Sequence, residues 1–161
     1  MAGFERYAWL MKSEPTEVSV EDVLHMPEQK VPWFGIRNYQ ARNFMRDDCK
    51  IGDPVLFYHS SCALPGIVGV GEIASLPYPD ETQFNDQSEY FDPKSTREKP
   101  RWVHVDVRVL YKVKIITLAD LRQIPGCESM TVLKKGNRLS ITPVNEEQWG
   151  ALRAHLVRED N

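Results

Sequence analysis

Side chains that can donate or accept hydrogen bonds stand directly beside short apolar runs at several points of this sequence. They are Ser13, His59, Ser60, Asn137 and Arg138. The ends of strands in an open barrel are places where a rigid scaffold presents polar groups to a ligand. The edge of a planar nucleobase, which carries several donors and acceptors, is a ligand that suits such groups.

A base also needs an aromatic or apolar wall against its face. The irregular segment 31–35 carries Trp33, which is a candidate for that wall. The alternative is that Trp33 fills the hydrophobic core, as large aromatic side chains commonly do. Composition leaves both interpretations of Trp33 open.

Catalysis has little support in the sequence. No GxSxG elbow and no HExxH pair is present, and the glycine-rich segment 66–71 fits neither GxGxxG nor a P-loop. A small enzyme acting on a nucleotide or a modified base, with His59, Asp53 or Glu14 as acid or base, is the competing hypothesis. A protein that binds a free nucleotide is a third possibility.

Metal and cofactor binding are not expected. The cysteines Cys49, Cys62 and Cys127 lie far apart, and the four histidines have no Cys or His partner at ligand spacing. We therefore predict neither a metal site nor a cofactor.

Charge and length limit the classes of partner. A net charge of −3 argues against a protein that coats duplex DNA through a broad cationic face. Local basic groups remain available, and we predict phosphate contacts at Arg37, Arg42 and Lys135. The 161 residues fit one domain, 1–161, without a signal peptide or membrane span. We expect a cytoplasmic protein, or a nuclear one in a eukaryote, of undetermined oligomeric state.

The elements that must position these side chains follow from apolar periodicity, caps and turn residues. The patterns predict strands over 7–12, 54–60, 66–73, 102–113 and 139–143, and helices over 19–25, 38–47, 117–124 and 145–157. Residues 77–100 contain four prolines and no periodicity, which predicts a long loop.

Single short helices between strands predict an α/β fold with one curved sheet or open barrel, in which all five strands join. The clearest strand is 102–113, where Val103, Val105, Val107 and Val109 share one face.

Several motifs in order resemble the EVE domain family, which has a PUA-like fold related to YTH domains. The strings are 9–15 (WLMKSEP), 33–43 (WFGIRNYQARN), 52–53 (GD), 57–60 (FYHS), 66–69 (GIVG), 78–80 (YPD), 92–95 (DPKS), 100–102 (PRW), 135–140 (KGNRLS) and 143–144 (PV). The resemblance covers nearly the whole chain. It implies a PUA-like pseudobarrel, with one curved mixed sheet and short flanking helices.

The resemblance also implies a site. Lys12 and Ser13 are similar to the Lys-Ser pair at the rim of the YTH pocket, and Trp33 is similar to its first cage tryptophan. The strand-end residues and the resemblance together give the predicted base-binding set, which is Lys12, Ser13, Trp33, Asn38, Tyr58, His59, Ser60, Asn137 and Arg138. The second cage tryptophan has no clear equivalent, and the candidates to replace it are Tyr78, Tyr90, Phe91 and Trp102.

The function implied is non-catalytic recognition of a modified nucleobase, such as methylated cytosine or an adenine derivative, in DNA or RNA. The base would be flipped from a strand into the aromatic-walled pocket. Unstacking a base costs about a few kcal/mol, and stacking on an aromatic ring returns roughly 1–3 kcal/mol. The expected partner is therefore a nucleic acid that carries a modified base, either single-stranded or easily opened.

Overall fold

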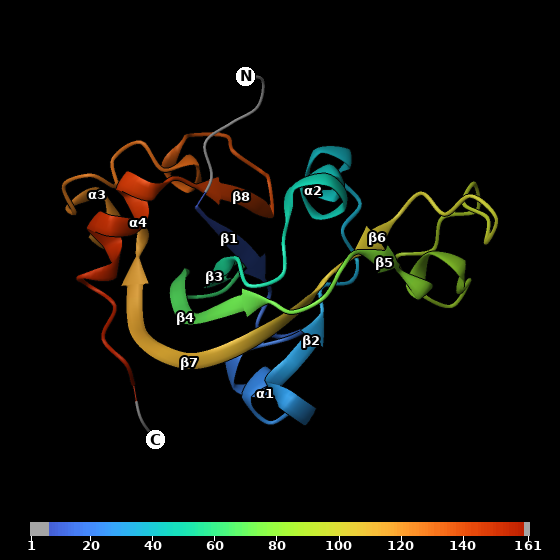
Figure 1. The fold of residues 1–161 in the computed structure, drawn as a ribbon, viewed down its shortest axis with the longest axis horizontal. Helices are drawn as coiled ribbons and strands as arrows, with labels where there is room; N and C mark the ends of the chain where they lie inside the picture. The colour runs from blue at the N-terminus through green and yellow to red at the C-terminus, as the bar shows by residue number, and fades with distance from the viewer. Residues whose placement is uncertain (1–6, 160–161) are drawn as a thin grey trace.

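The computed structural model describes residues 7–159. Its strands are β1 (Ala8–Ser13), β2 (Lys30–Pro32), β3 (Pro54–His59), β4 (Gly66–Ile73), β5 (Tyr78–Pro79), β6 (Val103–His104), β7 (Asp106–Thr117) and β8 (Ile141–Val144). Six of them form one sheet in the order β2-β7-β4-β3-β1-β8, which curls into a half-barrel (Figure 1). The sheet is mixed, because β1 and β3 run parallel while its other neighbours are antiparallel. The predicted curved mixed sheet is confirmed.

The helices are short and flank the sheet. They are α1 (Val20–Leu24), α2 (Tyr39–Asn43), α3 (Leu118–Arg122) and α4 (Glu146–Arg153), with single turns η1 (Pro27–Gln29), η2 (Phe44–Asp48), η3 (Glu81–Phe84) and η4 (Thr131–Leu133). Ser19, Thr117 and Asn145 each form a capping box, and Asn38 caps α2, as their side-chain chemistry predicts. The closing helix α4 ends at Arg153, four residues before the predicted end.

The sheet separates two hydrophobic clusters. Trp9 and Met11 of β1 belong to the first cluster, whereas Leu10, between them, belongs to the second. This alternation is the period of two expected for a strand buried on both faces. α1 and α2 contribute to the first cluster, and α3 and α4 contribute to the second.

The prediction of one continuous strand over 102–113 is wrong. The chain breaks pairing at Val105, so that β6 joins β5 in a separate two-stranded sheet and only β7 joins the main sheet. Register shifts in the pairing of β7 with β4 also change the face of its side chains. Val105, Val107 and Val109 therefore enter the first cluster, and Val113 enters the second.

The predicted long loop contains more order than its prolines suggest. β5 and the turn η3 lie near its start, and β5, β6 and the residues between them project to one side of the half-barrel (Figure 1). We refer to residues 80–102 as loop 80–102. Within residues 7–159, no helix has the length and apolarity needed to span a bilayer.

Candidate functional site

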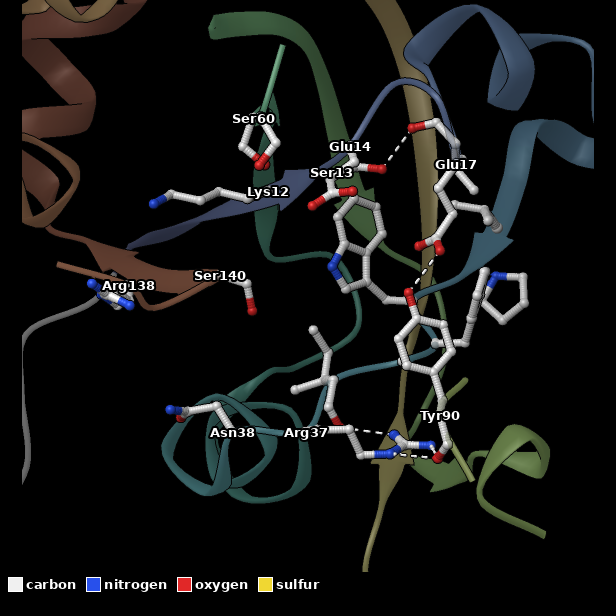
Figure 2. Close-up of a pocket in the computed structure, with 18 residues that line it drawn as sticks. Lys12, Ser13, Glu14, Glu17, Arg37, Asn38, Ser60, Tyr90, Arg138 and Ser140 are labelled. Atoms are coloured by element: carbon white, nitrogen blue, oxygen red, sulfur yellow. Dashed lines mark hydrogen bonds between the residues drawn. The ribbon is translucent and has the colours of Figure 1, made fainter. Parts of the chain in front are cut away.

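A cavity of about 360 Å³ opens where the ends of β1 and β3 meet the segment that follows β2 (Figure 2). Residues 138 and 140, before β8, and Tyr90, from loop 80–102, complete its lining. Parts of the chain far apart in sequence thus converge on one concave site. Its size falls in the range of small-ligand pockets, about 300–1,000 Å³.

The structure brings together part of the predicted site. The members of the predicted set that line the cavity are Lys12, Ser13, Trp33, Asn38, Ser60 and Arg138, and Arg37, predicted as a phosphate contact, lines it as well. The predicted residues outside the lining are Tyr58, His59, Asn137, Arg42 and Lys135.

Trp33 is buried in the hydrophobic core and also lines the cavity. Only 6% of the residue is exposed, and its ring packs edge-on against Phe57 with the ring centres 5.3 Å apart. Its backbone N–H donates to the carbonyl of Val105 at 2.9 Å, which fixes the segment after β2. The indole is therefore part of the first hydrophobic cluster and also part of the cavity wall.

Tyr90 is the one member of the four candidate second walls that lines the cavity. Its ring lies against Gly35, where a β-carbon would come within 2.8 Å of the ring. Gly35 also has a φ of +82°, so both its conformation and its missing side chain permit this approach. The hydroxyl of Tyr90 donates to Oε2 of Glu17 at 2.6 Å (Figure 2).

Hydrogen bonds from β1 and β3 hold the turn between β1 and α1, residues 14–19. The Ser13 hydroxyl donates to the carbonyl of Val18 at 2.6 Å, and the N–H of Val20 donates to Nε2 of His59 at 3.1 Å. The sequence assigned Ser13 and His59 to the base. In the structure, each makes a hydrogen bond that braces this turn, and their contact with a base stays a prediction.

His59 requires its neutral form to accept that bond. Burial lowers the pKa of the imidazole, against a smaller opposing effect of Asp22. Because the folded-state pKa lies below the ordinary value, stability from this group is complete above about pH 6.5 and declines as the pH falls below it.

We expect His59→Gln to reduce the acid sensitivity of the fold, since the amide oxygen can still accept from Val20 and does not protonate in this range. The melting temperature of the parent should fall more than that of the variant between about pH 7.5 and about pH 5. Burial also lowers the pKa of His104, which is present in both proteins and cancels in the comparison. Equal acid sensitivity in parent and variant would contradict this role of His59.

Arg37 braces loop 80–102. Its guanidinium donates twice to the Tyr90 carbonyl, at 2.9 and 2.7 Å, and contacts Asp80 at 3.2 Å and Thr82 at 3.0 Å. Asp80 is 1% exposed and also accepts from the N–H of Gly35 at 2.8 Å. These groups hold the guanidinium of Arg37 within the protein, and its phosphate contact stays a prediction.

The carboxylate of Asp80 is stabilised in its charged form. Burial opposes ionisation, but hydrogen bonds from Thr82 and Gly35 and the charge of Arg37 outweigh it, and the pKa of Asp80 is lowered.

Arg42 is also engaged within the protein. Its guanidinium lies 4.6 Å from the ring centre of Tyr39 and 5.7 Å from that of Trp102, and it donates to the carbonyl of Arg101 at 2.9 Å. Arg42 thus joins α2 to the end of loop 80–102. Lys135 is exposed and lies outside the lining.

The side chains of Tyr58 and Asn137 do not line the cavity. Tyr58 is 3% exposed and belongs to the second cluster, because adjacent strand residues point to opposite faces. The side-chain oxygen Oδ1 of Asn137 accepts from the N–H of Leu139 at 3.2 Å, which shapes the approach to β8. Its buried amide nitrogen has no hydrogen-bond partner among the described residues.

The EVE domain model matches residues 7–155. The chain belongs to the EVE domain family. A crystal structure of a protein from Pseudomonas syringae superimposes on this EVE domain with a TM-score of 0.86 at 44% identity, covering 92% of this chain and 98% of that one.

Human proteins are similar to this EVE domain as well. Human thymocyte nuclear protein 1 is 40% identical over 158 residues, which cover 88% of this chain and 70% of the human protein. A crystal structure of the human THYN1 protein in complex with DNA containing 5-methylcytosine has a TM-score of 0.86 at 37% identity, covering 95% of this chain and 99% of that one.

The rim of the EVE domain cavity carries charges of opposite sign on opposite sides. Figure 2 shows Lys12 and Arg138 on one side and Glu14 and Glu17 on the other. Burial lowers the pKa of Lys12. Sequence reasoning missed Glu17 altogether, since a glutamate in a turn carries no local signal of a site.

Proposed function

We propose that this EVE domain binds a modified nucleobase, with 5-methylcytosine in DNA as the first candidate, and that it acts as a single domain. The observation that carries the proposal is a cavity with Trp33 and Tyr90 in its lining, in a fold shared with a human protein crystallised with such DNA. Aromatic rings supply the stacking surface that every base can use. Polar groups around them supply the contacts to its edge.

We propose binding without catalysis. Of the three acid or base candidates, Glu14 lines the cavity, while His59 is engaged with Val20. Asp53 accepts hydrogen bonds from the indole of Trp9 at 3.0 Å and from the N–H of Lys50 at 2.9 Å. A general acid or base must reach the reacting atom, and of these three candidates Glu14 alone lines the cavity.

We propose that the strand is held electrostatically by the basic side of the rim. Lys12 and Arg138 line the cavity there, and Arg37 and Arg42 are engaged with loop 80–102 and its ends. Lys135 lies three residues before Arg138 in the chain, and its exposed amine is a further candidate phosphate contact. Such contacts position a strand without reading its sequence.

For the cellular compartment we propose the cytoplasm, or the nucleus if the cell is eukaryotic. The support is the name of the vertebrate relatives, thymocyte nuclear protein 1.

The test compares single-stranded oligonucleotides that carry cytosine or 5-methylcytosine at one central position. We expect tighter binding of the methylated strand, and we expect Tyr90→Ala to cost roughly 1–3 kcal/mol of that affinity, the usual worth of base stacking. Phe91→Ala is the matched control, because Phe91 neighbours Tyr90, is 39% exposed and lies outside the cavity lining.

Mass spectrometry of the oligonucleotide and of free modified nucleosides after incubation separates binding from turnover. Unchanged masses are expected. A converted base would favour the enzyme alternative, and equal affinity for both strands would refute recognition of the methyl group.

A further inference from the structure

A pocket that selects 5-methylcytosine must also exclude thymine. Thymine carries the same 5-methyl group, so contacts to the methyl alone do not distinguish the two bases. They differ at position 4, where cytosine has an amino group that donates and thymine has a carbonyl that accepts. Selectivity therefore requires an acceptor that faces position 4.

We propose that Glu17 is that acceptor, and that its carboxylate makes the cavity select cytosine over thymine. This inference rests on the proposed function and adds a specificity-determining residue to it. A carboxylate accepts from the amino group of cytosine and repels the carbonyl oxygen of thymine.

Glu17 offers a fixed and available acceptor. Its Oε2 receives the hydroxyl of Tyr90 at 2.6 Å, and Figure 2 shows this pair beside the cavity. The second oxygen, Oε1, receives no hydrogen bond within residues 7–159. No lysine or arginine of that range forms an ion pair with Glu17.

The turn that carries Glu17 is already ordered. The N–H groups of Glu17 and Val18 both donate to the carbonyl of Glu14 at 2.9 Å. Ser13 and His59 hold the same turn from β1 and β3, as described above. Less freedom is lost on binding when the acceptor is held before the ligand arrives.

The Tyr90 hydroxyl connects base stacking with edge recognition. The ring that lines the cavity also positions the carboxylate, so one residue serves both parts of the site. Glu14 lines the cavity too, but its carboxylate accepts no hydrogen bond from the described residues. The geometry therefore favours Glu17 over Glu14.

The experiment measures dissociation constants of the full chain for single-stranded oligonucleotides with 5-methylcytosine, cytosine or thymine at the same position. Glu17→Gln has nearly the same shape, and its carbonyl can keep the bond from Tyr90 while its amide turns toward the ligand. We expect the preference for 5-methylcytosine over thymine to fall about ten- to a hundredfold. Glu17→Ala, which removes the acceptor, should also lose the preference.

Glu98→Gln is the control, since it changes the net charge equally at an exposed position outside the cavity lining. It should keep the preference of the parent. Circular dichroism melts of all variants establish that differences in affinity do not come from unfolding.

The outcomes separate the two proposals. If the parent prefers 5-methylcytosine over cytosine, while Glu17→Gln and Glu17→Ala both keep its preference over thymine, the role of Glu17 is refuted and the proposed function stands. The same holds if Glu14→Gln alone removes the preference. If the parent does not distinguish 5-methylcytosine from cytosine, the proposed function fails and this inference fails with it.

Discussion

Replacing Trp33 by alanine is expected to lower the free energy of unfolding by about 3–5 kcal/mol, the usual cost of deleting a large buried aromatic side chain. The indole is 6% exposed and packs against Phe57 in the first hydrophobic cluster. The same substitution should remove roughly 1–3 kcal/mol of affinity for a modified oligonucleotide, because the cavity loses a stacking surface. Denaturant unfolding and binding, measured on one preparation, report the two effects.

Trp33→Phe and Trp149→Ala are the control variants for Trp33→Ala. Phenylalanine keeps a ring and should restore part of both losses. Trp149 packs at the second cluster and stacks with Tyr7, so its removal should destabilise the fold without a direct effect on binding by the folded protein. If Trp33→Ala has a lower melting temperature, yet binds as tightly as the parent at temperatures at which both proteins are folded, Trp33 is a core residue only.

Replacing Arg37 by alanine is expected to destabilise the fold by about 3–5 kcal/mol, because it leaves a buried carboxylate without its partner charge. That carboxylate is Asp80, which is 1% exposed. The variant also loses both hydrogen bonds to the Tyr90 carbonyl, so Tyr90 should be less well placed at the cavity. Chemical unfolding measures the first effect, and faster amide hydrogen exchange in loop 80–102 reports the second.

Arg46→Ala is the matched control for Arg37→Ala. Arg46 pairs with Asp47 at 2.9 Å on the surface, where such pairs contribute about 0–1 kcal/mol. The pH dependence provides a second check. Since the pKa of Asp80 is lowered, its contribution is present above about pH 3.8 and declines as the pH falls further, and Arg37→Ala should weaken this dependence. If Arg37→Ala unfolds like Arg46→Ala and only its salt-dependent binding changes, Arg37 is a phosphate contact after all.

Features of the fold that depend on neighbouring residues were predictable from the sequence. The capping boxes at Ser19 and Thr117 involve residues three apart, so their pattern is visible in any short window. The apolar runs of β1, β3 and β4 are buried on both faces and are recognisable by composition.

Features that depend on distant partners were not predictable in this way. β2 has three residues and is stabilised by pairing with β7, about 75 residues later in the chain, so its own sequence carries little signal. The break of the long strand at Val105 likewise reflects where β5 finds its partner.

The same distinction between neighbouring and distant residues applies to the site. Ser13 and Ser60, which stand beside apolar runs in the sequence, lie at the cavity because strands end there. Tyr90 and Glu17 are 73 positions apart, and their contact requires the approach of Tyr90 to Gly35. Arg37 has the composition of a phosphate contact, and the buried Asp80 that engages it is recognisable only in three dimensions.

The position of β1 between β3 and β8 has a consequence for the kinetics of folding. Trp9 pairs with Val55, and Ala8 pairs with Val144, so the first strand acquires its second neighbour near the end of the chain. Such distant pairing slows folding, because a long loop must close before the contact contributes. At synthesis rates of about 5–20 residues per second, on the order of ten seconds pass between the synthesis of β1 and the synthesis of β8. During that interval one edge of β1 lacks its partner, and Lys12 and Ser13 at its end cannot yet form a complete cavity. We expect nascent chains that stop before β8 to need a chaperone, and we expect binding activity to appear only after β8 has been synthesised and has paired with β1.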